Sequence, residues 1–243
     1  VGNALFKCST INFDETSSYQ QLILAMLNEA YIKNYRRYKS NCCKQIVTPD
    51  GYNTKAWKPV MDIQEFVYDV AQKETNFVLW KHLTQKGSSA RDVIKHLGEC
   101  KDQQFPAITK DRHLWSFNNG VFHSKMMDPS TGKYVCKFYK YDEDEINFIN
   151  PTTISSKYFD KNFNTYDHLD WKDIPTPHFQ MVLDYQDFDT EVKNWMYVMG
   201  GRLCFEVSEL DSWQIIPFLK GIARSGKSTL ITKVFKKFYD SDD

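Results

Sequence analysis

The sequence predicts an α+β protein with a largely helical N-terminal part, a β-hairpin in its middle and the start of an α/β domain at its C-terminal end. Three observations lead to this class. Apolar residues recur at helical spacing before residue 100. An Asn119-Gly120 pair stands between two apolar runs. After residue 212, an apolar run, a glycine-bounded loop and a second helical pattern follow one another.

Composition limits the kind of protein further. A chain of 243 residues, 42% of them hydrophobic, can form one large or two small packed domains. Because 31 Lys and Arg residues balance 31 Asp and Glu residues, nucleic-acid affinity would need a local basic patch. The sequence shows no apolar run of membrane-spanning length and no signal peptide, and its six scattered cysteines are typical of reduced thiols. We therefore expect an intracellular protein of a reducing compartment, with no membrane partner.

The N-terminal helical pattern carries a basic face. An apolar stripe runs over residues 22–31, and we expect this helix to continue through residue 44. Five basic side chains interleave with tyrosines there: Lys33, Arg36, Arg37, Lys39 and Lys44. Such a surface can hold a phosphate backbone and stack bases. A solvated helix face with tyrosines packed beneath it is the commoner meaning of the same pattern.

Helices give way to strands in the middle of the chain. Further helices are expected over residues 62–83 and 89–97. The Asn119-Gly120 pair predicts a hairpin with a type I′ turn, and the alternation of Lys133–Tyr141 predicts another strand. Surface connectors are expected over residues 155–164 and 174–179.

Two acids with one residue between them, Asp187 and Asp189, allow two interpretations. On a strand both carboxylates would lie on one face, as in a two-metal site. Because Asp189 precedes an apolar run with helical spacing, the beginning of a helix is favoured. Gly200-Gly201 is expected to end that helix, ahead of a strand over Arg202–Val207.

The most informative stretch is WQIIPFLKGIARSGKSTL, from Trp213 to Leu230, which fits GxxxxGK[ST] between Gly221 and Ser228. In that pattern backbone N–H groups form a nest for a triphosphate. Lys227 would neutralise phosphates as the catalytic candidate, and the Ser228 hydroxyl would complete the ligand shell of Mg²⁺. The candidate nucleotide-binding residues are Gly221, Ile222, Ala223, Arg224, Ser225, Gly226, Lys227, Ser228 and Thr229. A glycine-rich turn before a lysine-bearing helix is the structural alternative.

Three segments together resemble the poxvirus-type primase-helicases of large DNA viruses. They are WSFNNGVF at Trp115–Phe122, KYFDKNFN at Lys157–Asn164, and RLCFEVSELDSWQIIPFLKGIARSGKSTL at Arg202–Leu230. In that family a primase region comes first, a linking domain follows, and a superfamily 3 helicase motor of the AAA+ type closes the chain. The resemblance implies a linking domain plus the first strand, phosphate-binding loop and first helix of a truncated motor. The expected parts are residues 1–60 (N-terminal helical segment with the basic face), 61–188 (linking domain with the hairpin) and 189–243 (start of the P-loop domain).

The resemblance also implies a function. The parent protein would be an ATP-dependent DNA helicase of viral replication that binds ATP and Mg²⁺. It would assemble as a ring, expected to be hexameric, on single-stranded or forked DNA, in a cytoplasmic virus factory or in the nucleus. Arg224 and Ser225 stand where relatives commonly carry small residues. No carboxylate pair follows the loop, so this piece is not expected to hydrolyse ATP alone. Two alternatives stay open: a non-catalytic DNA-binding or oligomerisation module, and an unrelated P-loop NTPase.

Overall fold

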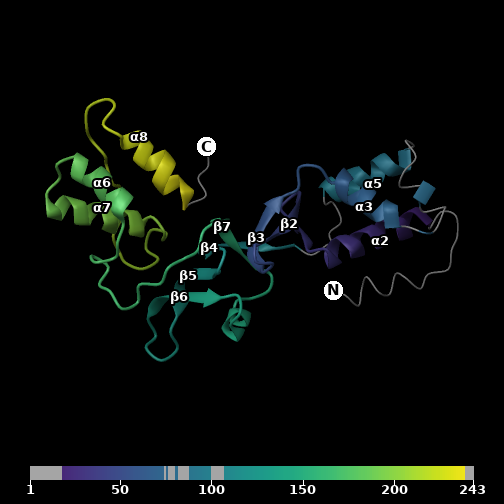
Figure 1. Ribbon diagram of the computed structural model, residues 1–243, viewed down its shortest axis with the longest axis horizontal. Helices are drawn as coiled ribbons and strands as arrows, with labels where there is room; N and C mark the ends of the chain where they lie inside the picture. Colours follow the sequence, from purple (N-terminus) through teal and green to yellow (C-terminus); the bar gives the residue numbers. More distant parts are fainter. Residues whose placement is uncertain (1–17, 74, 76–79, 82–87, 100–106, 239–243) are drawn as a thin grey trace. The chain divides into compact units, whose positions relative to one another are not determined.

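The computed structural model describes residues 18–73, 75, 80–81, 88–99 and 107–238. The chain divides into two compact units, one of residues 1–110 with 147–154 and one of residues 111–146 with 155–243 (Figure 1). Over the described residues the protein is α+β, with a three-stranded and a four-stranded sheet. The expectation of a largely helical N-terminal part is wrong, because the first unit contains a sheet of its own.

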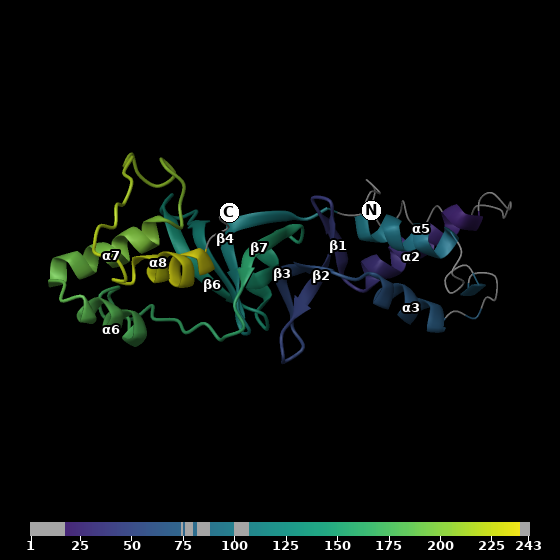
Figure 2. The ribbon, with the colours of Figure 1, turned by 90° about the horizontal axis from the view of Figure 1, so that it is seen from above.

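The first unit joins its sheet to helices. Its strands, in sheet order, are β1 (Tyr35–Tyr38), β2 (Asn41–Val47) and β3 (Asn53–Pro59), and both pairings are antiparallel. Its helices include α2 (Ser18–Ile32), α3 (Gln64–Lys73) and α5 (Ser88–Glu99), which lie together in Figure 2. The predicted stripe of α2 is buried in the core through Ile23, Met26, Leu27 and Ala30. The predicted helices over 62–83 and 89–97 are confirmed where the structure describes them, as α3 and α5.

The predicted continuation of the first helix is wrong, since α2 ends at Ile32 and a β-hairpin follows. Two backbone positions account for the change. Asn34 adopts a positive φ of 60°, a conformation that ends helices and that asparagine tolerates. Lys39 adopts a φ of 53° in the turn between the strands. Tyr35 and Tyr38 also favour a strand, because aromatic residues fit a pleated, half-buried surface.

The second unit contains the other sheet. Its strands are β4 (Thr109–Ser116), β5 (Gly120–Met127), β6 (Tyr134–Lys140) and β7 (Thr153–Tyr158), and the sheet order is β6-β5-β4-β7. A short 3₁₀ helix, η1 (Asp144–Phe148), precedes β7. The predicted hairpin and the predicted strand at Lys133–Tyr141 are confirmed. A type I′ turn needs positive φ at Asn119 and Gly120, which they lack, so that turn type is wrong.

The hairpin tip is shaped by a segment far along the chain. The Asn119 amide nitrogen donates to the Phe163 carbonyl at 2.9 Å, and the Phe163 N–H donates to the Asn119 amide oxygen at 2.8 Å. The Phe163 ring lies 5.0 Å from Phe117, 5.0 Å from Phe122 and 4.9 Å from Phe138, centroid to centroid. The prediction that residues 155–164 form a surface connector is therefore wrong, because they complete β7 and pack on the hairpin.

Helices follow the sheet. They are α6 (Pro177–Tyr185), α7 (Thr190–Arg202), α8 (Lys227–Thr229), a π-helical turn η2 (Leu230–Val234) and a 3₁₀ turn η3 (Phe235–Lys237). The Asp189 carboxylate accepts from the Val192 N–H at 2.8 Å and caps α7, which confirms the helix interpretation of this acid. The helix α7 ends at Arg202, one residue after Gly201, as predicted to within a residue. The strand predicted over Arg202–Val207 is wrong, because turns follow the helix there. Among the described helices, none has the length and apolar character to cross a bilayer.

Candidate functional site

The loop Gly221–Thr229 is organised around a lysine. The Lys227 ammonium donates to the carbonyl oxygens of Gly221 at 2.9 Å and of Ile222 at 2.6 Å. A third bond joins it to the Ser225 hydroxyl at 2.9 Å. The side chain therefore folds back over its own loop, and three oxygens surround its charge.

Backbone geometry shows why glycines stand at the two ends of the pattern. Gly226, the residue before α8, has a φ of 85°, which favours glycine. A Cβ on Gly221 would lie 3.1 Å from the Ser225 hydroxyl and 3.5 Å from the Lys227 ammonium. Arg224 adopts a φ of 64°, and it is exposed. The loop conformation thus favours glycine at position 226, whereas a side chain at position 221 would press on the side chains of Ser225 and Lys227.

The segment before the loop departs from expectation. Residues 213–222 form neither a helix nor a strand, and no described residue pairs with them in a sheet. Ile216, Phe218 and Ile222 are 93%, 85% and 82% exposed. The predicted first strand of an α/β motor is therefore wrong for the described chain, because an apolar strand is buried only where a neighbouring strand pairs with it.

The predicted helix after the loop does form, as α8, η2 and η3 in succession. Its apolar side chains hold it in place. The ring of Phe235 packs so closely on Gly200 of α7 that a Cβ there would lie 3.0 Å from it. The ring centroids of Phe238 and Phe159 lie 5.4 Å apart. The Phe238 backbone carbonyl accepts a hydrogen bond from the Trp115 indole N–H at 3.1 Å. These contacts anchor the loop's helix to the rest of the second unit.

A largely apolar cavity adjoins the loop. It has a volume of about 910 Å³ and is bordered by Lys227 and Ser228 on one side. Trp195, Met199 and Phe218 contribute apolar walls. The loop residues that would hold phosphate and metal therefore lie beside a space of ligand size.

The metal prediction depends on Ser228. Ser228 is exposed and lies at the start of α8, next to Lys227. Within the described ranges no group of three or more His, Cys, Asp or Glu residues could hold a metal ion. A single hydroxyl fits Mg²⁺ only where phosphates and waters supply the remaining ligands.

The basic residues predicted to contact nucleic acid have different roles. The Arg36 guanidinium donates to the carbonyls of Tyr31 at 2.9 Å and of Tyr35 at 2.7 Å. It also stacks 3.9 Å from the Tyr31 ring, and burial lowers its pKa. Lys33 pairs with Asp69 at 2.5 Å. These two cations are therefore engaged within the first unit.

The three others lie on the hairpin. Lys39, in the turn, and Lys44, on β2, are both exposed. Their ammonium groups lie 5.7 Å from the Tyr38 ring and 5.4 Å from the Tyr35 ring. Arg37 is half-buried on β1. Sequence reasoning thus placed these basic residues on a helix, whereas Arg36, Arg37, Lys39 and Lys44 belong to the hairpin of β1 and β2, and only Lys39 and Lys44 are exposed there.

Comparison with known proteins now identifies the family. A family model described as "D5 N terminal like" matches residues 26–184, which is more than half of the chain. The chain belongs to this family. The domain is found at the N-terminal part of D5-type primase-helicase proteins of large DNA viruses, so the resemblance is confirmed at the level of the family. A search of curated proteins gave no match.

The D5 N terminal like region contains two of the three segments that carried the resemblance, Trp115–Phe122 and Lys157–Asn164. These two segments contact each other through Asn119 and Phe163. The loop Gly221–Thr229 lies beyond the matched residues, so the match does not test it.

Sequence reasoning missed a polar cluster that joins the D5 N terminal like region to the residues after α7. One Glu209 carboxylate oxygen lies 2.5 Å from the Lys125 ammonium and 2.8 Å from His113 Nε2. The other accepts from the Glu206 N–H at 2.7 Å. Burial alone would raise the pKa of Glu209, but the hydrogen bonds from Lys125, Glu206 and His113 outweigh it and lower the pKa to about 2.

A histidine between a carboxylate and a serine resembles a hydrolytic triad in composition. His113 Nδ1 lies 3.2 Å from the Ser124 hydroxyl. Ser124 is only 6% exposed and also bonds the His113 carbonyl, so its oxygen is not presented to a substrate. The cluster therefore holds the segment around Glu209 against the sheet. No motif in the sequence predicts it.

Proposed function

We propose that this chain is part of an ATP-dependent primase-helicase of viral DNA replication, with Gly221–Thr229 as its nucleotide-binding loop. The observation that carries the proposal is the Lys227 ammonium held inside its loop by the carbonyl oxygens of Gly221 and Ile222. Phosphate oxygens are stronger acceptors for an ammonium than neutral carbonyls. A bound triphosphate would therefore attract the amine away from the loop backbone.

Other residues supply the rest of the site. Backbone N–H groups of the loop would bind the phosphates, and the Ser228 hydroxyl would be the protein's ligand to Mg²⁺, which neutralises phosphate charge when bound. The cavity beside Lys227 and Ser228 has room for the base and ribose. Arg224, exposed and in a left-handed conformation, would stay clear of the phosphates and be available to a neighbouring subunit of a ring.

The proposal extends to partners. DNA, single-stranded or forked, would be the substrate of the complete protein, which would work as a hexameric ring in a virus factory or in the nucleus. Family membership supports this assignment, because D5-type proteins are primase-helicases of large DNA viruses.

Nucleotide binding by the chain itself tests the proposal, with binding and not turnover as the readout. A fluorescent ATP analogue with Mg²⁺ should bind the chain, and Lys227→Ala should weaken binding about 10- to 150-fold, the loss expected for a charge-assisted hydrogen bond. Lys233→Ala is the matched control, because this exposed lysine lies in η2 outside the loop. Equal affinity in Lys227→Ala and the unchanged chain would overturn the assignment.

A second function is favoured by the exposed Lys39 and Lys44 on the hairpin. A non-catalytic DNA-binding module would bind DNA independently of the loop. Its DNA affinity would survive Lys227→Ala and fall steeply with salt. The double variant Lys39→Ala/Lys44→Ala would reduce both the affinity and the salt slope.

A further inference from the structure

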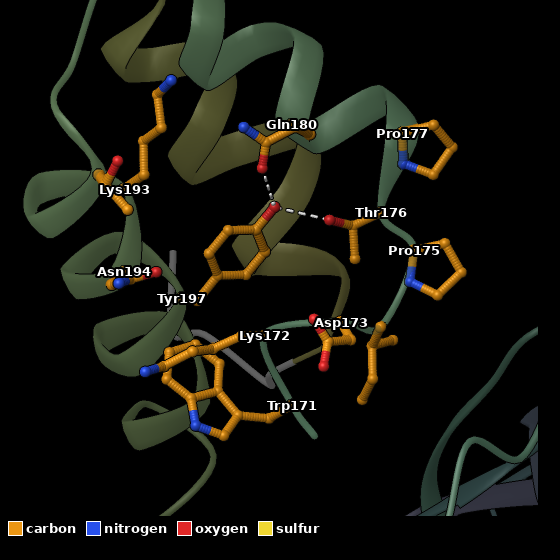
Figure 3. A pocket seen from close by; sticks show the side chains of 12 residues that line it. Trp171, Lys172, Asp173, Pro175, Thr176, Pro177, Gln180, Lys193, Asn194 and Tyr197 are labelled. Carbon is orange, nitrogen blue, oxygen red and sulfur yellow. Dashed lines mark hydrogen bonds between the residues drawn. The ribbon is translucent and has the colours of Figure 1, made fainter. Parts of the chain in front are cut away.

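A cavity of about 700 Å³ lies within the second unit, between α6, α7 and the segment that precedes α6 (Figure 3). Its lining includes Trp171, Lys172 and Asp173 before α6, and Asn194 and Tyr197 on α7. This volume falls in the range of small-molecule sites. The cavity is distinct from the one beside the phosphate-binding loop, and no residue of that loop lines it.

One wall of this cavity is held rigidly. The Tyr197 hydroxyl lies 2.6 Å from the Thr176 hydroxyl and donates to the Gln180 side-chain oxygen at 3.2 Å (Figure 3). The Tyr197 ring also meets Phe179 edge-on, with ring centroids 5.0 Å apart. Pro175 and Pro177 on either side of Thr176 restrict the backbone there. A ligand would therefore meet a preformed surface.

The two lysines of the lining differ in how they are engaged. The Lys193 ammonium is paired with Asp184 at 2.6 Å, so its charge is balanced within the helices. Lys172 is exposed, and its ammonium lies 5.5 Å from the centre of the Trp171 ring. Trp171 itself is 46% exposed, although it lines the cavity. The cavity thus offers an accessible indole with an exposed cation beside it.

We propose that this cavity binds a single nucleotide unit, with its base stacked on Trp171 and its phosphate near Lys172. Every nucleobase has a flat face that an aromatic side chain can stack on. The Asn194 amide and the Asp173 carboxylate supply donors and acceptors for the base edge. A proline-rich peptide would also pack on an indole, but it would need neither the cation nor these edge-binding groups. That the nucleotide belongs to a DNA strand rests on the proposed function. That the cavity recognises a nucleotide does not.

The test uses a short labelled oligothymidylate in the Lys227→Ala background, so that the loop cannot contribute. Trp171→Ala should weaken binding about 5- to 150-fold, the range measured for loss of one stacked base. Trp171→Phe keeps a ring and should retain part of the affinity. Tyr185→Ala is the control, since this aromatic of α6 is 88% exposed and does not line the cavity.

Stacking is read directly with 2-aminopurine in the strand. Its fluorescence should be quenched by the chain and restored by Trp171→Ala. Binding of thymidine monophosphate as tightly as the strand would identify a free nucleotide as the ligand. An abasic strand that binds equally well, unchanged affinity in Trp171→Ala, or binding of a proline-rich peptide but no nucleotide would each overturn the proposal. Loss of ATP binding in Lys227→Ala is measured separately, so either proposal can fail without the other.

Discussion

Replacement of Asn119 by alanine should destabilise the second unit selectively. Its side chain forms both hydrogen bonds to the backbone of Phe163, one as donor at 2.9 Å and one as acceptor at 2.8 Å. Alanine removes both partners and leaves the Phe163 N–H and carbonyl unpaired. Phe163 is half-buried, so water can reach these groups only in part.

The size of the effect follows from these two bonds. An intramolecular hydrogen bond contributes about 0.5–1.5 kcal/mol net, and two of them give about 1–3 kcal/mol. Partial access of water to Phe163 keeps the loss from exceeding that range. Asn119→Asp should also be destabilising, because it keeps the acceptor for the Phe163 N–H but places a carboxylate oxygen against the Phe163 carbonyl.

Urea denaturation followed by circular dichroism measures the change in unfolding free energy. Asn162→Ala is the matched control, since this asparagine lies in the same segment and is exposed. The expected pattern is a loss in Asn119→Ala, a loss in Asn119→Asp and almost none in Asn162→Ala. If Asn119→Ala changes the unfolding free energy by less than about 0.3 kcal/mol, the asparagine does not hold the two segments together.

Three other substitutions test the second unit. Gly120→Ala should lower the unfolding free energy by more than about 3 kcal/mol. The added Cβ would lie 2.3 Å from the Tyr139 carbonyl oxygen, so β5 and β6 would have to move apart. Gly132→Ala, with open space but a φ of 64°, should cost only about 1–2 kcal/mol, and comparable losses in the two variants would contradict this account. The lowered pKa of Glu209, about 2 against an ordinary 4.5, means that its contribution to stability is complete above pH 4.5 and is lost as the pH falls toward 2. Glu209→Gln should therefore flatten the decline of the urea midpoint below pH 4.5, and an unchanged decline would show that other groups cause it.

Local features of this fold were predictable from the sequence. Asn119 and Gly120 between apolar runs predicted a hairpin correctly, because residues adjacent in sequence make its pairing. The acid Asp189 before an apolar run predicted the beginning of α7, because a cap depends on the next three residues only. The periodic stripe of α2 likewise predicted its buried side.

Features that depend on distant partners were not predictable. Tyr35–Tyr38 reads YRRY, which has no period-2 alternation, and four residues are too few to signal a strand directly after a helix. Glu209 meets Lys125 and His113 across separations of 84 and 96 residues, which no spacing rule encodes. The apolar residues before Gly221 predicted a buried strand, but burial requires a neighbour that the described chain does not provide. The candidate loop itself was located by its motif, whereas the Trp171 cavity has no motif and emerges only when α6 and α7 pack.

The contact between Asn119 and Phe163 can form during synthesis only after both residues have been made. A hairpin made of neighbouring strands can close within microseconds of leaving the ribosome. Phe163, 44 residues downstream, is made about 2 to 9 seconds later at ordinary translation rates. During that interval the hairpin exposes Phe117 and Phe122, and Phe138 joins them once β6 has been made, until Phe163 covers all three. The nascent chain should therefore recruit chaperones most strongly in this window, and release them once residue 163 has emerged.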